Sequence, residues 1–206
     1  MQVCANTMPP NSTIIGVDLD EIKKVPGTLS FVGDITKAET YERLRKELKG
    51  RKCDAVLNDG APNVGANWNK DAFTQSELVL ASFKLATDFL KPGGYFVTKI
   101  FRSTDTNSLM WVFKKFFEKV EMTKPKASRF ASAETFVVGC GFNAPNFIDE
   151  KFFDPQHVFK DTEADHFKDQ MAGQITSLDK LLENRRNRGG YETNAPMHLT
   201  KYTTLT

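Results

Sequence analysis

The sequence predicts an α/β fold with a mostly parallel sheet, helices on both faces and an antiparallel final strand. Short apolar runs alternate along the chain with segments of helical periodicity, which is typical of parallel sheets. The last two apolar runs lie too close together for a full helix between them, and this spacing predicts an antiparallel pair. Hydrophobic residues make up 40% of the 206 residues, as is usual for a globular domain.

Three short apolar runs in the first part of the chain predict buried strands, and an aspartate follows each run closely. The runs and their aspartates are residues 14–17 with Asp18, residues 29–32 with Asp34, and residues 55–57 with Asp59. Between the second and the third run, the charged segment 40–48 predicts a surface helix.

The next part of the chain begins with a long helical stripe of apolar residues at 74–90. The Pro-Gly-Gly that follows predicts the end of this helix. The remaining predicted elements are a strand at residues 95–100, an aromatic-rich helix at residues 108–117, and two strands at residues 120–123 and 135–142.

The chain changes character after Pro145, where the sequence becomes acidic and weakly periodic. We therefore predict a domain over residues 1–145 and an extension over residues 146–206 that is partly helical and partly disordered. All three histidines lie in this extension. A site in the first domain would use no histidine, which argues against Ser-His-Asp, Cys-His and histidine-ligated zinc mechanisms. The three cysteines form no CxxC pair, so no zinc site or disulfide framework is predicted.

Charged side chains stand at the carboxyl ends of the predicted strands, where ligands bind in open α/β sheets. Asp18, Asp34 and Asp59 follow three of the strands, and Lys99 lies near the end of a fourth. A single aspartate at such a place is often only a turn residue. Three of them, together with a lysine inside an apolar strand, favour a binding or catalytic site.

Lys99 is the most unusual of these residues, because it follows YFVT and precedes IF in an apolar strand. A lysine in such a strand needs carboxylate partners. Asp59 is one candidate partner, and Glu134, which opens the last strand, is the other. An ammonium group held in this way can orient a substrate hydroxyl and stabilise the negative charge that develops on its oxygen.

Five segments of the chain carry a resemblance to a known family. They are IIGVDLD, FVGDIT, LNDGAPNVG, DAFTQSELVLASFKLATDFLKPGGYFVTKIFRS and KPKASRFASAETFVVGCGF. Together, and in this order, they resemble the FtsJ/RrmJ family of S-adenosyl-L-methionine-dependent RNA 2′-O-ribose methyltransferases over residues 1–145. The resemblance implies a Rossmann-like class I methyltransferase sheet.

The resemblance also implies roles for the charged residues. The last three members of the family's Lys-Asp-Lys-Glu catalytic tetrad fall on Asp59, Lys99 and Glu134. Binding of S-adenosyl-L-methionine is implied for Asp18 beside the adenosine ribose, for Asp34 at the adenine amino group and for Asp59 at the cofactor cleft. It is also implied for Leu19 and Ile35. No metal is implied.

Several segments resemble the nucleolar eukaryotic pre-rRNA branch of the family more than its bacterial or tRNA-modifying branches. They include DGAPNVG followed by a tryptophan, KIFRS, WVFKKFFEKVE and the extension FNAPNFIDEKFFDPQHVFKD. This resemblance implies pre-rRNA within a pre-ribosomal particle as the partner, ribosome biogenesis as the process, and the nucleus and nucleolus as the location. No membrane partner is expected, since no apolar run approaches the roughly 18 residues that a membrane helix needs.

The chain departs from the family pattern at its start. The family's first catalytic lysine, its Gly-rich cofactor loop and the strand before that loop precede the segment that matches residues 2–5. We therefore expect a sheet truncated at its N-terminal side, with two unpaired inner edges on the strands at residues 14–17 and 55–57.

Basic residues gather between residues 114 and 129 and suit contact with an RNA backbone, although a solvated helix face is an equally good interpretation. They are Lys114, Lys115, Lys119, Lys124, Lys126 and Arg129, with Arg102 nearby. Two alternatives to a methyltransferase remain. One is a catalytically inactive RNA-binding scaffold derived from the same fold. The other is a nucleotide-sugar or dinucleotide enzyme, which the absence of a GxGxxG motif disfavours.

Overall fold

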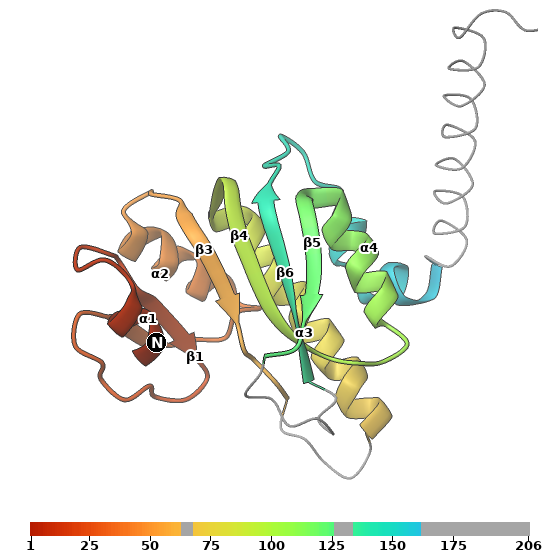
Figure 1. Cartoon of the computed structure of the whole chain (residues 1–206), viewed down its shortest axis with the longest axis horizontal. Helices are drawn as coiled ribbons and strands as arrows, with labels where there is room; N and C mark the ends of the chain where they lie inside the picture. Colours follow the sequence, from red (N-terminus) through yellow and green to blue (C-terminus); the bar gives the residue numbers. More distant parts are fainter. Residues whose placement is uncertain (63–67, 126–133, 162–206) are drawn as a thin grey trace, which may run out of the picture. The chain divides into compact units, whose positions relative to one another are not determined.

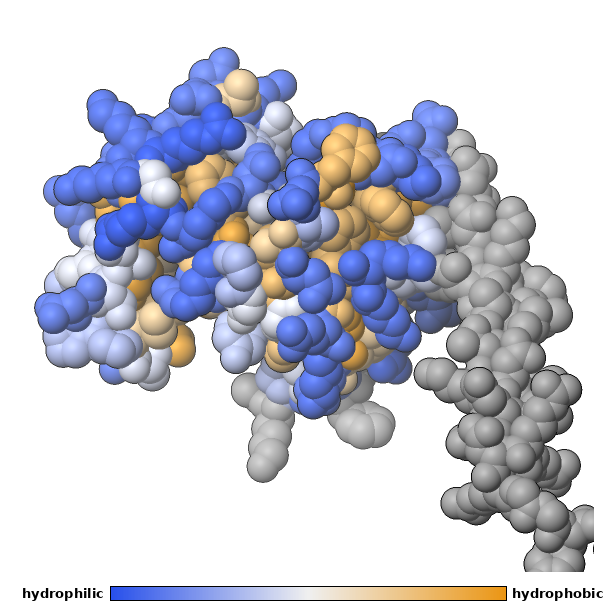
Figure 2. All heavy atoms as spheres, turned by 90° about the horizontal axis from the view of Figure 1, so that it is seen from above, coloured by the Kyte–Doolittle hydropathy of each residue, from blue (hydrophilic) through white to orange (hydrophobic). Residues whose placement is uncertain are grey.

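The computed structural model describes residues 1–62, 68–125 and 134–161, all of which belong to one compact unit, Met1–Glu163. Strands and helices alternate along this unit as the sequence predicted (Figure 1). None of its described helices combines the length and the hydropathy that crossing a bilayer requires. From the end at which β3 and β4 begin, the surface is mostly hydrophilic with apolar side chains between the polar ones (Figure 2).

Four strands form the larger sheet in the order β3-β4-β6-β5. They are β3 (Cys53–Asn58), β4 (Leu90–Phe101), β6 (Glu134–Phe142) and β5 (Phe117–Thr123). β3 and β4 are parallel, whereas β6 is antiparallel to both of its neighbours. The predicted antiparallel end of the sheet is therefore confirmed.

Two further strands, β1 (Ile15–Asp18) and β2 (Leu29–Val32), form a separate parallel pair. β1 and β3 each lie at an edge of their own sheet, and they do not pair with each other in the described residues. Leu57 of β3 is accordingly 60% exposed, although the sequence of β3 predicts a buried strand. This arrangement matches the expectation of two unpaired inner edges.

Phe83 stands at the centre of the main core and is completely buried. It belongs to α3 (Trp68–Phe89), and its ring lies 5.4 Å from that of Phe96 in β4 and 4.9 Å from that of Phe113 in α4 (Thr106–Phe116). The Phe96 ring also contacts Phe113, at 5.6 Å. Because one residue of β4 contacts both helices, α3 and α4 pack on the same face of the sheet.

The opposite face of the larger sheet is less covered than the sequence predicted. Side chains alternate along β4, so that Phe96 and Ile100 are buried beneath the helices while Tyr95, Val97 and Lys99 point the other way. Tyr95 remains 51% exposed. Among the described elements, helices thus cover one face of this sheet, whereas helices on both faces were expected.

A second, smaller apolar cluster joins the two sheets. Phe31 of β2 and Leu44 and Leu48 of α2 (Ala38–Leu48) pack with Leu85 and Phe89 of α3. The short helix α1 (Gln2–Thr7), which the sequence did not predict, lies against β1 through the preceding residue. A Cβ on Gly16 would come 2.0 Å from the sulfur of Met1, so a larger residue at this position would displace the flexible methionine side chain.

The junction between α3 and β4 differs from the prediction by several residues. α3 ends at Phe89, and β4 begins at once with Leu90, which pairs with Cys53. The pairing then shifts, since Ala55 is opposite Tyr95. The residues between form a bulge in which Gly93 has a φ of 75°. The Pro-Gly-Gly segment therefore ends the helix as expected but lies inside the strand.

The beginning of the predicted extension is part of the compact unit, which continues past the predicted boundary at residue 145. Two short helices, η1 (Glu150–Phe153) and η2 (His157–Asp161), pack onto α3 and α4. Phe153 lies 5.8 Å from the Phe83 ring, and Val158 is completely buried. The rest of the extension, residues 162–206, lies outside the described residues.

Replacing Phe153 with alanine should destabilise the domain, because the ring closes the core over Phe83. We expect a loss of about 2 kcal/mol in the free energy of unfolding, below the range for a completely buried phenylalanine. Chemical denaturation measures this change. Phe147→Ala in the same segment is the matched control, since Phe147 is 82% exposed and its loss should change stability by less than about 0.5 kcal/mol. Equal stability of the two variants would contradict the packing described.

Candidate active site

Lys99 and Asp59 form an ion pair at the carboxyl end of β3. The register of the parallel pair places Asn58 opposite Thr98, so that the next residues along the two strands are Asp59 and Lys99. The Lys99 Nζ lies 2.9 Å from Asp59 Oδ1. The lysine side chain is only 14% exposed, whereas that of Asp59 is 80% exposed. The carboxylate thus faces solvent, and the ammonium lies behind it.

Glu134 approaches the same ammonium group from the other side. β6 runs antiparallel to β4 with Glu134 opposite Phe101 and Phe136 opposite Lys99. Glu134 and Lys99 therefore occupy diagonal positions on one face of the sheet. Their charged atoms, Nζ and Oε1, are 3.8 Å apart. The predicted proximity of Lys99 to both carboxylates is confirmed.

A polar contact behind the ion pair ties the ends of β3 and β4 together. Asn58 Nδ2 donates a 2.9 Å hydrogen bond to the hydroxyl of Thr98, which is completely buried. The side-chain oxygen of Asn58 accepts a hydrogen bond from the Gly60 N–H at 3.1 Å. The carboxamide thus holds the turn that contains Asp59 against the strand that contains Lys99. Asn58 and Thr98 were not predicted from the sequence as supports of the ion pair, because their contact depends on the strand register.

Asp18 lies at the end of β1, where the sequence analysis placed it. Its backbone oxygen accepts a 2.8 Å hydrogen bond from the Gly33 N–H, and its carboxylate accepts one from the Asp20 N–H at 3.2 Å. The next residue, Leu19, is 70% exposed. An exposed carboxylate beside an exposed apolar side chain suits a ligand with hydroxyl groups and an apolar edge.

Asp34 follows β2 and forms a tight turn with Thr36. Its Oδ1 accepts hydrogen bonds from the Thr36 N–H at 2.9 Å and from the Thr36 hydroxyl at 2.7 Å. These bonds favour the charged form and lower the pKa of Asp34 below its usual value. Because both bonds end on Oδ1, the second oxygen can still accept a hydrogen bond from an amino group. Ile35 is half-buried and packs against the smaller apolar cluster.

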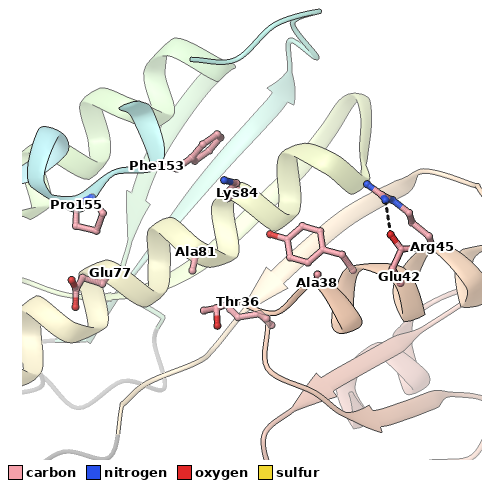
Figure 3. A pocket seen from close by; sticks show the side chains of 11 residues that line it. Thr36, Ala38, Glu42, Arg45, Glu77, Ala81, Lys84, Phe153 and Pro155 are labelled. Atoms are coloured by element: carbon pink, nitrogen blue, oxygen red, sulfur yellow. Dashed lines mark hydrogen bonds and ion pairs between the residues drawn. The ribbon is translucent and has the colours of Figure 1, made fainter. Parts of the chain in front are cut away.

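A groove of about 520 Å³ lies between α2, α3 and the start of the extension (Figure 3). Tyr41 and the Glu42–Arg45 ion pair line one side, and Lys84 and Phe153 line another. Burial, together with two nearby carboxylates, raises the pKa of Tyr41 to about 12. Ile35, one of the predicted cofactor-binding residues, lines this groove, whereas none of the five charged residues of the predicted site does. Among the described residues, no group of three or more His, Cys, Asp or Glu could hold a metal ion.

Comparison with known proteins identifies relatives over most of the chain. The family model described as FtsJ-like methyltransferase matches residues 1–142. A solved structure from Plasmodium falciparum, titled a putative ribosomal RNA methyltransferase, superposes with a TM-score of 0.57 at 26% sequence identity. The superposition covers 63% of this chain and 72% of that one.

Curated relatives share about half of their aligned residues with this chain. An AdoMet-dependent rRNA methyltransferase spb1 of Aspergillus fumigatus is 51% identical over 191 residues, which is 93% of this chain and 23% of that protein. A pre-rRNA 2′-O-ribose RNA methyltransferase FTSJ3 of Gallus gallus is 53% identical over 163 residues, which is 79% of this chain and 20% of that protein. The chain thus spans about a fifth of the length of these relatives.

The turn at Asp34 should make stability depend on pH in the acid range. The folded state lowers the pKa of this carboxyl below its value in the unfolded chain, so its contribution to stability is present above the unfolded pKa, near 3.8. That contribution is lost as the pH falls through the folded pKa. In Asp34→Asn, the free energy of unfolding should therefore fall less between about pH 5 and pH 3 than in the wild type, as measured by urea denaturation.

Thr36→Val is the second variant for this measurement, because it removes the hydroxyl bond and keeps the backbone bond to Asp34. Its dependence on pH should lie between those of the wild type and Asp34→Asn. Identical acid dependence in all three proteins would show that the turn does not hold the carboxylate.

Proposed function

Because the chain belongs to the FtsJ-like methyltransferase family, we propose that it transfers a methyl group from S-adenosyl-L-methionine to a ribose 2′-hydroxyl of rRNA. The observation that carries this proposal is the Lys99 ammonium held between Asp59 and Glu134. Asp59 directly follows β3, Lys99 lies in β4 and Glu134 opens β6, and the three residues meet at one end of the sheet. A relative of the same family is named for 2′-O-ribose methylation of pre-rRNA, which supports this choice of acceptor.

The three residues suit the chemistry of a ribose hydroxyl, which is a weak nucleophile at neutral pH. The Lys99 ammonium donates a hydrogen bond to the 2′-oxygen, orients it and stabilises the negative charge that develops there during attack. Asp59 and Glu134 fix the direction in which the ammonium points. S-adenosyl-L-methionine, when bound, supplies a methyl group that a sulfonium makes electrophilic.

The ends of β1 and β2 fit the adenosine part of the cofactor. Asp18 offers an exposed carboxylate to the ribose hydroxyls, and Leu19 offers an apolar surface. Asp34 can accept a hydrogen bond from the adenine amino group through its second oxygen. The two aspartates lie near each other, because the Asp18 carbonyl binds the N–H of Gly33, which directly precedes Asp34.

Basic side chains on α4 and β5 support RNA as the substrate. Lys114 and Lys115 are exposed in the last turn of α4, and Lys119 and Lys124 are exposed on and after β5. Lysines placed in this way can neutralise backbone phosphates. Lys126 and Arg129, which the sequence analysis added to this group, lie outside the described residues.

The relatives support a biological setting for the proposed reaction. We propose that the substrate is pre-rRNA within a pre-ribosomal particle, that the reaction belongs to ribosome biogenesis, and that it takes place in the nucleolus. The names of relatives as rRNA and pre-rRNA methyltransferases support this setting. The Lys99–Asp59–Glu134 group favours an enzyme over an inactive RNA-binding scaffold, because a scaffold has no need of a largely buried lysine between two carboxylates.

Lys99→Ala should abolish methyl transfer to RNA and leave the binding of S-adenosyl-L-methionine within a few-fold. Transfer of a labelled methyl group in a single turnover measures the first effect, and titration calorimetry measures the second. Asp59→Ala should weaken both, since its carboxylate also borders the proposed cofactor cleft. Near-normal turnover in Lys99→Ala would remove this residue from the mechanism, and a wild-type protein that binds RNA without any transfer would favour the scaffold.

Replacing Lys114 and Lys124 with glutamate should weaken RNA binding and reduce its dependence on salt. The logarithm of the binding constant should change less steeply with the logarithm of salt concentration, on the order of one unit of slope for each phosphate that is no longer neutralised. Fluorescence anisotropy with an rRNA fragment measures this slope. The control is Lys23→Glu, an exposed lysine far along the chain from this group. An unchanged slope would identify the lysines as ordinary solvated residues.

A further inference from the structure

β4 extends past the end of β3. Beyond that point, a side chain of α3 forms hydrogen bonds with the backbone of β4. The last residue of β3 that pairs with β4 is Asn58, opposite Thr98, whereas β4 continues to Phe101. The side chain of Gln75 in α3 lies at this place and is completely buried. Its Nε2 donates a 2.7 Å hydrogen bond to the carbonyl of Lys99, and its Oε1 accepts one from the Phe101 N–H at 3.2 Å.

The Gln75 carboxamide thus takes the place of a neighbouring peptide group. Within a strand, the carbonyl of one residue and the N–H of the residue two positions later point to the same side, and a neighbouring strand normally pairs with both. One carboxamide satisfies both groups here. On its other side, β4 pairs with β6, where Lys99 is opposite Phe136. At Lys99, β4 is therefore held by the carboxamide of Gln75 on one side and flanked by β6 on the other.

The contact belongs to a polar network that includes the Lys99 carbonyl and the residues directly before Asp59 and Lys99. The Thr98 hydroxyl donates a 3.2 Å hydrogen bond to the same Lys99 carbonyl and accepts the 2.9 Å bond from Asn58. Asn58 directly precedes Asp59, and Thr98 directly precedes Lys99. The side chains of Asn58 and Thr98 lie on the face of the sheet that α3 covers, whereas the Lys99 ammonium and the Asp59 carboxylate lie on the opposite face. A shift of the Lys99 carbonyl would therefore move Nζ relative to Asp59.

We propose that Gln75 is a positioning residue, which fixes the backbone of Lys99 so that its ammonium stays between Asp59 and Glu134. The proposal rests on the proposed function in assigning this ammonium to the reaction, but the geometry on which it depends is independent of that assignment. Gln75 acts through Lys99 and is not placed in contact with the substrate. A buried glutamine among the apolar positions of an amphipathic helix is the sequence signal that indicates such a residue.

The test compares three variants of the full-length protein. Gln75→Met keeps the shape of the side chain and removes both hydrogen bonds. Gln75→Glu keeps an acceptor for the Phe101 N–H and, when ionised, lacks the donor to Lys99. Ser82→Ala is the matched control, because Ser82 is a buried polar residue of the same helix whose hydroxyl binds only within that helix, to the Val79 carbonyl.

Two readouts distinguish positioning from a loss of stability. The first is kcat and KM for methyl transfer, normalised to the folded fraction of each variant. The second is the ¹³Cε chemical shift of Lys99, assigned by its absence in Lys99→Arg, which reports the surroundings of the ammonium without any substrate. In Gln75→Met we expect kcat to fall on the order of 100-fold with KM nearly unchanged, as a displaced catalytic group would cause. Its Lys99 resonance should also move, and Gln75→Glu should show smaller effects of the same kind.

The outcomes separate this proposal from the proposed function. A Lys99 resonance that stays at its wild-type position in Gln75→Met, or one that moves as much in Ser82→Ala, would overturn the positioning role. A wild-type protein with no methyl transfer, in which Gln75→Met still moves the Lys99 resonance, would refute the proposed function and retain the positioning role. An unchanged kcat with a moved resonance would overturn the link between the position of Lys99 and turnover.

Discussion

The candidate site depends on the register of β3 against β4. With Asn58 opposite Thr98, the residues that follow are Asp59 and Lys99, and they come within 2.9 Å of each other. A slip of one residue would send every side chain of one strand to the other face of the sheet, because side chains alternate along a strand. The bonds of Asn58 to Thr98 and of Gln75 to Lys99 therefore stabilise the one register in which the charged groups meet.

The packing of α3 links this register to the main core. Phe83 fits between Phe96 of β4 and Phe113 of α4, and Gln75 lies about two turns earlier on the same helix. The aromatic contacts hold the helix against the sheet, and this holds the carboxamide of Gln75 against the end of β4. The Phe153 ring of the extension packs against Phe83 in the same core. The residues after Pro145 thus contribute to the domain that carries the site.

The two halves of the proposed site rest on separate sheets. The carboxylates suited to the adenosine end of the cofactor lie at the end of β1 and after β2, whereas the ion pair joins Asp59, which follows β3, to Lys99 near the end of β4. In the described residues, the sheets are joined by the apolar cluster around Phe31, Leu44 and Leu85 rather than by strand pairing. Side-chain packing is less directional than a ladder of hydrogen bonds. The larger sheet is therefore the more rigid part of the site, because backbone pairing and the buried Gln75 carboxamide both hold it.

The sequence alone determined the order and type of the strands and of α2, α3 and α4, because hydrophobic periodicity and Pro-Gly signals are local properties. It also placed Asp18, Asp34, Asp59 and Lys99 at or near strand ends, since a charged residue at the end of an apolar run can be recognised in the sequence. Tertiary structure decided which of these groups meet. Strand register brought Glu134 to Lys99 across 35 positions of sequence, and helix packing brought Gln75 to the Lys99 carbonyl. It also placed Phe153 and Val158 in the core and left one face of the larger sheet without a described helix. Glu134 was predicted from the sequence as a candidate partner of Lys99, but the contacts of Gln75, Phe153 and Val158 join residues far apart in the chain and were not predicted.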